Sequence, residues 1–320
     1  MHRRTVLSAL IGSLFLAQAS GVQAQAGPIT LVVGSTAGGS TDTLARTLGK
    51  IMSDKLGRSV VIDNKPGGNG MISDGYVARA RPDGNTLLVA AMALTLSPLV
   101  LKNPPYDPVE SFTPIAMLAR LPNLLVARKD APFDTTEEMI AYAKAHPGEV
   151  NVAVVGLGTS IHLASEDFKH QAGIDMMNVP YKGTSAALVD LMGGVVDVLF
   201  VGSASALQHV KSGSIKALAA TSLERMKELP NVPTLSETIP GFESIAWFGL
   251  FGPAGMAPDL VQQLDDATQA SLAEPDMLAR IELEGGLAGQ MSRQEFAQFV
   301  QSEVVRLKDL VTRANIQLTS

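Results

Sequence analysis

The chain has 320 residues, of which 46% are hydrophobic, no cysteine, and a formal net charge of −6. Its length suggests about two domains with substantial cores, and the lack of cysteine excludes disulfides and thiol catalysis. An acidic chain without basic clusters is a poor candidate for binding nucleic acid or an anionic membrane.

Residues 1–24 have the pattern of an export signal. Arg3 and Arg4 precede an uncharged apolar run over residues 6–17, and small residues around Ala24 fit a signal-peptidase site. The run is shorter than the ~20 residues of a spanning helix, which argues against a membrane anchor. We expect export and removal of this segment, by either the Sec or the twin-arginine route. Its loss leaves 23 basic and 31 acidic residues, a net charge of −8.

The stretch from Leu31 to Arg46 is predicted to form a strand, a glycine turn and a helix start. Gly38 and Gly39 expose backbone amides, and three capping residues follow as Ser40, Thr41 and Asp42. Amides at a helix N-terminus attract an anion, either a phosphate or a carboxylate. A tight turn without a ligand is the alternative. The glycine spacings of dinucleotide-binding and P-loop motifs are absent here.

Two further strands are expected at 59–62 and 86–91, and helices alternate with them. This alternation predicts a parallel sheet with right-handed crossovers. Residues 97–122 contain six prolines, so we interpret this segment as irregular, with a domain connection near its end.

A second alternating series follows. Its predicted strands are 124–127, 150–155, 176–180, 195–201 and 215–220, and its predicted helices are 134–145, 161–171 and two that begin near 184 and 204. The strand at 150–155 leads into the glycine-rich loop 156–160 and a helix, which repeats the opening pattern. A strand at 244–251 is expected to return to the first domain, and three helices close the chain from Pro258, Pro275 and Ser292.

No enzyme motif is present. His162, Glu166 and His170 share one helix face, but the H-E-x-x-H motif is absent and the two histidines lie about two turns, roughly 12 Å, apart. A plain capped helix is therefore favoured over a metal site. A nucleophile elbow is also absent, and we expect no cofactor.

Several motifs, in their order and spacing, resemble the substrate-binding proteins of tripartite tricarboxylate transporters, the Bug or TctC family. The matching segments are 31–46, 64–70, 77–88, 179–183, 194–197, 232–234 and 252–255.

The resemblance implies an α/β periplasmic binding protein of type II, the Venus-flytrap kind, in which each domain is a sheet flanked by helices. Domain 1 would comprise residues 27–123 and 246–320, and domain 2 residues 124–245. The domains would close by a hinge near Pro122 and Trp247. A periplasmic monomer would capture a small carboxylate and present it to membrane transporter subunits or to a sensor kinase. The alternative is an exported α/β enzyme that acts on a small carboxylate.

Carried over motif by motif, the resemblance places ligand contacts in both domains. The domain 1 contacts are Thr36, Ala37, Gly38, Gly39, Asp42, Ala93 and Thr95, and the domain 2 contacts are Gly158, Thr159, His162 and Asp197. Neither glycine-rich loop has a lysine or arginine, so we expect neutral amides, the Thr159 hydroxyl and helix dipoles to hold the carboxylate.

The chain departs from the family pattern where the family carries bulky or polar walls. Small or apolar residues stand at Met92, Ala93, Leu94, Val201 and Gly202. They predict a ligand less polar than citrate, such as an aromatic acid or a medium-chain dicarboxylate.

Overall fold

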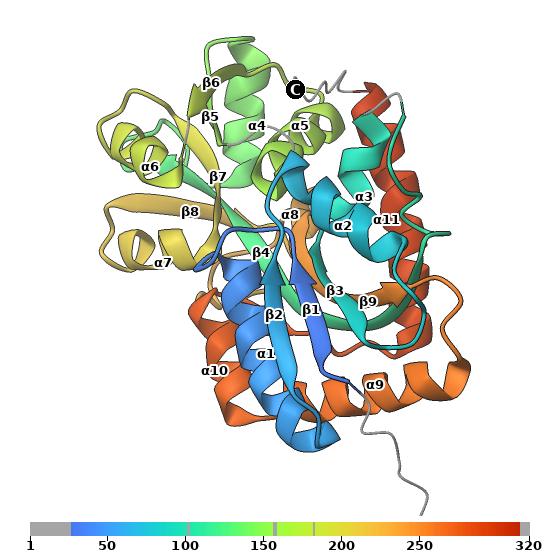
Figure 1. Cartoon of the computed structure of the whole chain (residues 1–320). Helices are drawn as coiled ribbons and strands as arrows, with labels where there is room; N and C mark the ends of the chain where they lie inside the picture. Colours follow the sequence, from blue (N-terminus) through green and yellow to red (C-terminus); the bar gives the residue numbers. More distant parts are fainter. Residues whose placement is uncertain (1–26, 101–102, 156–158, 182, 314–320) are drawn as a thin grey trace, which may run out of the picture.

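The computed structural model describes residues 27–100, 103–155, 159–181 and 183–313. The predicted export signal lies outside these ranges. The structure is a ten-stranded α/β sheet with strand order β2-β1-β3-β9-β4-β7-β5-β6, and β8 and β10 also pair with β4. Helices cover both faces of the sheet (Figure 1).

Lobe A is built on β1, β2, β3, β9, β10 and residues 112–122 of β4. Its strands are β1 (Ile29–Val33), β2 (Val60–Asn64), β3 (Thr86–Ala91), β9 (Ile245–Pro253) and β10 (Leu287–Ala288). Its helices are α1 (Ser40–Leu56), η1 (Gly68–Gly70), α2 (Met71–Ala78), α3 (Ala93–Leu96), η2 (Ser97–Val100), α9 (Pro258–Leu272), α10 (Pro275–Leu283) and α11 (Arg293–Arg313). The predicted parallel pairing of β1 with β2 and β3 is confirmed.

Lobe B is built on β5 to β8 and residues 123–128 of β4. Its strands are β5 (Asn151–Val155), β6 (Met177–Tyr181), β7 (Val198–Gly202) and β8 (Ile215–Ala220). Its helices are α4 (Thr136–Ala145), α5 (Ser160–Ala172), α6 (Thr184–Met192), α7 (Ser203–Lys211) and α8 (Leu235–Thr238). The predicted strands and helices of this series are present, with ends shifted by a few residues, except that the strand predicted at 124–127 is the second part of the longer β4.

The prediction that residues 97–122 are irregular is wrong for the second part of this segment. Strand β4 spans Phe112–Arg128, pairs with β9 through Pro122 and continues into lobe B through β7 and β8. Proline lacks an N–H and is tolerated at strand edges and bulges. Pro114 lies beside a register shift, and among the described strands only β9 pairs with Pro114 and Pro122.

The two chain crossings between the lobes meet at one hydrogen-bonded node. We define this crossing node as Asn123 of β4, Thr221 after β8 and Ser244 before β9, all three buried. The Thr221 amide donates to the Asn123 carbonyl, the Asn123 amide donates to the Thr221 hydroxyl, and the Ser244 amide donates to the Thr221 carbonyl. The outgoing and returning chain segments are therefore held together where the lobes join.

Candidate functional site

Two backbone amides of the loop between β1 and α1 already donate hydrogen bonds within this segment. The Gly38 amide donates to Asp42 Oδ2 at 2.8 Å, and the Gly39 amide donates to the Thr36 carbonyl at 3.3 Å. Thr36, Ala37 and Gly38 are exposed. Gly39 is the N-cap of α1 and has no side chain with which to bond the first turn. The amides of that turn therefore depend on another acceptor.

Asp42 is buried beneath this loop, where it is a positioning residue. Its carboxylate accepts hydrogen bonds from Gly38, from Arg46 Nε at 2.9 Å and from Asn64 Nδ2 at 2.8 Å. The Arg46 hydrogen bond, with help from the other two, lowers the pKa of Asp42 to about 2 against the opposing effect of burial. The negative charge of Asp42 is thus compensated by donors from the loop, from α1 and from β2.

A cavity of about 240 Å³ opens where β1 and β3 end. It is lined by Gly34, Ser35, Thr41, Gly67, Asn69, Gly70, Asp74, Val89, Ala90, Ala91, Ala93 and Leu94. In Figure 1 the β1 and β2 arrowheads point toward lobe B. Ligands of open α/β sheets bind beyond the carboxyl ends of the strands, so this cavity is the candidate site.

The sequence-based set overlaps the cavity lining only in part. Ala93 lines it, whereas Thr95 is fully buried and its hydroxyl donates to the Met92 carbonyl at 2.8 Å. Of the apolar departures, Ala93 and Leu94 face the cavity, while Met92 and Val201 pack in hydrophobic cores.

Ser35 and Asp74 also line the cavity, and sequence analysis missed both. Among the described residues, no group hydrogen-bonds the buried Ser35 Oγ. Asp74 lies on α2 and is 3% exposed. Burial raises its pKa to about 7, although the hydrogen bonds that its ionised form would accept from the Ser73 and Tyr106 hydroxyls act in the opposite direction. The available signal was a single acid in the short helix between β2 and β3, and buried acids of this kind gather at functional sites.

In lobe B, Thr159 caps α5. Its hydroxyl donates to the Val155 carbonyl at 2.9 Å and accepts the His162 amide at 3.3 Å. A hydroxyl has one hydrogen, so in this arrangement it has none to donate to an anion. Gly158, predicted as a contact, lies outside the described residues.

His162 is buried, 6% exposed, in the first turn of α5. Burial lowers its pKa, and its Nε2 lies 3.9 Å from Glu166 Oε1. Glu166 is engaged by Lys169 at 2.7 Å, and His170 is exposed. Within the described ranges, no three His, Asp or Glu side chains gather to hold a metal ion.

Asp197 is separated from the other predicted contacts. It precedes β7, and its carboxylate accepts hydrogen bonds from Arg128 Nε at 2.9 Å and the Asn151 amide at 2.8 Å. Asn151 begins β5, whereas Thr159 follows the end of β5. Five strand residues at about 3.3 Å each put Asp197 at the opposite edge of the sheet. It therefore braces the start of two strands.

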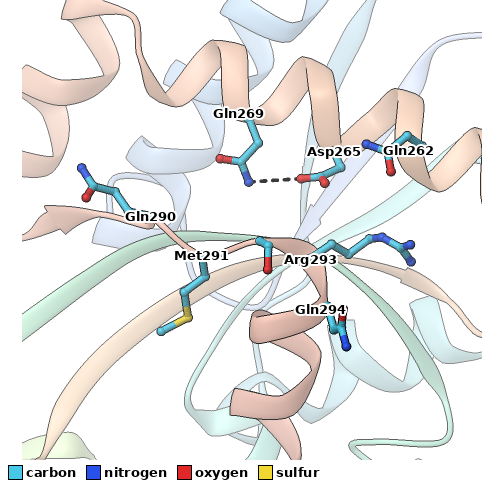
Figure 2. Close-up of a pocket in the computed structure, with 8 residues that line it drawn as sticks. Gln262, Asp265, Gln269, Gln290, Met291, Arg293 and Gln294 are labelled. Carbon is cyan, nitrogen blue, oxygen red and sulfur yellow. Dashed lines mark hydrogen bonds between the residues drawn. The ribbon is translucent and has the colours of Figure 1, made fainter.

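A larger hollow of about 520 Å³ lies between α9 and the start of α11. Figure 2 shows its polar lining, with Gln269 Nε2 donating to Asp265 Oδ1 at 3.1 Å. Helix α9 lies at the bottom of Figure 1, where β1 and β2 begin. This hollow is therefore remote from the carboxyl ends of those strands.

None of the described helices has the length and apolar composition needed to cross a bilayer.

Most of the chain matches known proteins. A family model described as the tripartite tricarboxylate transporter family receptor matches residues 44–316. A UPF0065 protein encoded between tcbD and tcbE in Pseudomonas sp. (strain P51) is 35% identical over 286 residues, which cover 89% of this chain and 85% of that protein.

Three solved structures are each 33% identical to this chain. A protein of R. palustris with adipate has a TM-score of 0.73, with 91% of this chain and 98% of that chain covered. The periplasmic binding protein BugD has a TM-score of 0.70, with 91% and 99% covered. MatC from Rhodopseudomonas palustris with bound malate has a TM-score of 0.70, with 89% and 99% covered.

Proposed function

The chain belongs to the tripartite tricarboxylate transporter receptor family, whose members are solute-binding receptors and not enzymes, and from this premise we propose that it captures a small carboxylate in the periplasm. The ligand would bind between two domains, residues 27–123 with 246–320 and residues 124–245. The bound carboxylate would then be presented to the membrane subunits of a tripartite transporter.

One observation carries this proposal: the cavity at the ends of β1 and β3 adjoins the uncapped first turn of α1. Thr41 of that turn lines the cavity, and Gly39 offers no side-chain acceptor to the turn's amides. A carboxylate in the cavity would accept those hydrogen bonds and benefit from the helix dipole. The Ser35 hydroxyl, which has no hydrogen-bond partner among the residues that the structure describes, would supply a further donor.

The loop residues Thr36, Ala37, Gly38 and Gly39 and the lobe B residues Thr159 and His162 remain in the proposed site. They would contact the ligand when the domains close. Domain closure excludes water, which strengthens the hydrogen bonds between protein and ligand.

The ligand class is proposed from the cavity wall and from the relatives. Val89, Ala90, Ala91, Ala93 and Leu94 make one side of the cavity apolar. Two relatives hold the dicarboxylates adipate and malate. A medium-chain dicarboxylate or an aromatic acid would place its less polar body against this side.

Calorimetry with adipate, malate, benzoate and citrate tests the proposal. We expect at least one of the less polar acids to bind more tightly than citrate and to be recovered chemically unchanged. Ser35→Ala should weaken that binding about 5- to 10-fold, because it removes one donor. Ser302→Ala, on the exposed side of α11, is the matched control and should leave binding unchanged. Failure of all four acids to bind, or chemical conversion of a bound acid, would contradict the proposal.

A further inference from the structure

The cavity at the ends of β1 and β3 contains a buried acid that the proposed function does not use. Among the described residues that line it, Asp74 alone is ionisable, and neighbours such as Gly34, Ser35, Thr41 and Gly70 are uncharged. A carboxylate ligand would therefore share a small volume with a second carboxyl group.

The hydrogen-bond geometry around Asp74 suits a protonated side chain. Ser73 Oγ lies 2.6 Å from the Gly70 carbonyl oxygen and 2.9 Å from Asp74 Oδ1. Serine has a single hydroxyl hydrogen, so it can donate to only one of them. Both contacts are hydrogen bonds if protonated Asp74 donates to Ser73 Oγ and Ser73 donates to Gly70. The Tyr106 hydroxyl then donates to Asp74 Oδ2 at 3.0 Å.

Among the described residues, no cation hydrogen-bonds to Asp74 or pairs with it, and its partners are the hydroxyls of Ser73 and Tyr106. The elements packed most closely against α2 are η1, β1, β3 and β9, and none of the four contains an ionisable residue. On α2 itself the other titratable group is Tyr76, which is exposed beneath Lys65. Arg79 follows the helix, and its guanidinium lies beside Gly75 but is not among the groups that shift the pKa of Asp74. Burial therefore dominates, which agrees with the raised pKa of about 7.

We propose, on the basis of the function proposed above, that Asp74 determines which ligands this cavity accepts: a carboxylate binds only against the protonated Asp74 side chain. Two carboxylates in one site cannot both remain ionised at low cost, so the ligand raises the pKa of Asp74 further. Binding above neutral pH then requires uptake of one proton from solvent. The proton from solvent forms an O–H bond on the Asp74 carboxyl group and stays there, and no bond of the ligand changes.

Calorimetric titration with adipate tests the proposal in the intact mature protein. Between pH 6.5 and pH 8 adipate stays ionised, whereas Asp74 passes from mostly protonated to mostly ionised. Affinity should fall about tenfold over this interval. At pH 7, titrations in buffers with different ionisation enthalpies should show uptake of about half a proton per adipate bound.

Asp74→Asn is the decisive variant because its amide is close in size to the carboxyl group and always neutral. It should bind adipate equally at both pH values, without proton uptake. Asp54→Asn makes the same change at an exposed position on α1 and should retain the wild-type pH dependence. If Asp74→Asn does not fold, Tyr106→Phe provides a second test, because loss of this donor should move the midpoint of the pH dependence upward.

Equal adipate affinity at pH 6.5 and pH 8 in the wild-type protein would overturn this inference and leave the proposed function intact. A tenfold loss that persists in Asp74→Asn would also overturn it. Failure of every carboxylate in the panel to bind at either pH would instead contradict the proposed function.

Discussion

The junctions after β1 and after β5 have similar sequences, a strand, a glycine-rich loop and a helix, but the two helices begin with different caps. After β1 the helix cap is Gly39, and the buried Asp42 carboxylate holds the loop. After β5 the cap is Thr159, whose hydroxyl bonds the His162 amide of its own helix. The first junction offers no side-chain cap to its helix amides, whereas the second satisfies one of its own. The two glycine-rich loops would therefore contribute unequally to the proposed binding site.

Asp42→Ala should have the largest effect, because it removes the group that gives the first junction its shape. Three donors lose their acceptor, which should lower the free energy of unfolding by about 2 to 3 kcal/mol. Carboxylate affinity should fall more than 100-fold as the loop loosens. Urea denaturation and calorimetry measure the two effects.

Asp54→Ala, an exposed acid on the same helix, is the control and should change stability by less than about 0.5 kcal/mol. An Asp42→Ala protein that keeps wild-type affinity would show that the loop does not depend on this carboxylate.

Thr159→Val should have an intermediate effect and shows whether the second junction also anchors the ligand. Loss of the α5 cap should cost about 1 kcal/mol of stability. Because the hydroxyl hydrogen is engaged by Val155, we expect carboxylate affinity to change less than threefold. Thr47→Val, whose hydroxyl donates to a carbonyl inside α1, is the matched control. A tenfold loss of affinity in Thr159→Val alone would mean that both junctions hold the anion.

Gly39→Ser should have the smallest effect on stability, because it gives the first junction the kind of cap that the second already has. A Cβ here would lie 3.5 Å from Ser35 Oγ, an ordinary contact, so the side chain is accommodated. Thermal denaturation should show a gain of a few tenths of a kcal/mol.

The new hydroxyl should compete with a carboxylate for the amides of α1 and weaken its binding severalfold. Gly39→Ala adds the Cβ alone and separates steric effects from capping. Unchanged affinity in Gly39→Ser would place the ligand away from these amides.

Much of the fold was predictable because local signals and packing agreed. A β-branched run predicted the strand at 30–33, and capping residues predicted the starts of α4 and α11. The predicted α/β fold of periplasmic binding proteins is confirmed by the sheet flanked by helices and by the likeness to BugD.

The proline content of residues 112–122 gave the wrong prediction. Proline disrupts a strand that has hydrogen-bonded neighbours on both sides, but it is tolerated where only one side is paired. Pro114 and Pro122 occupy positions where, in the described part of the sheet, β9 is the one partner of β4. Edge status follows from the order of strands, which local sequence does not carry.

The candidate site was predictable as a loop but not as a set of side-chain roles. Motif spacing located the turn at 34–42, yet the engagement of Asp42 by three donors depends on Arg46 and on Asn64 of another strand. The family resemblance placed Asp197 at a strand end in the site, but it lies at the start of β7 and not at its end. Asp74 had no motif, because its significance comes from burial in the folded state.

The return of the chain from lobe B to lobe A through β9 has a consequence for the order in which the protein folds during synthesis. All strands of lobe B, including the second part of β4, emerge from the ribosome as one continuous run that ends with β8. Lobe A must wait, because β3 obtains its partner β9 only after the whole of lobe B has been made. Domains fold largely as units as they emerge, so lobe B is expected to be complete while β1 to β3 still lack β9. The strands β1 to β3 are thus made early but complete their sheet late. An exported nascent chain would carry an unpaired sheet edge at β3 until residues 245–253 appear.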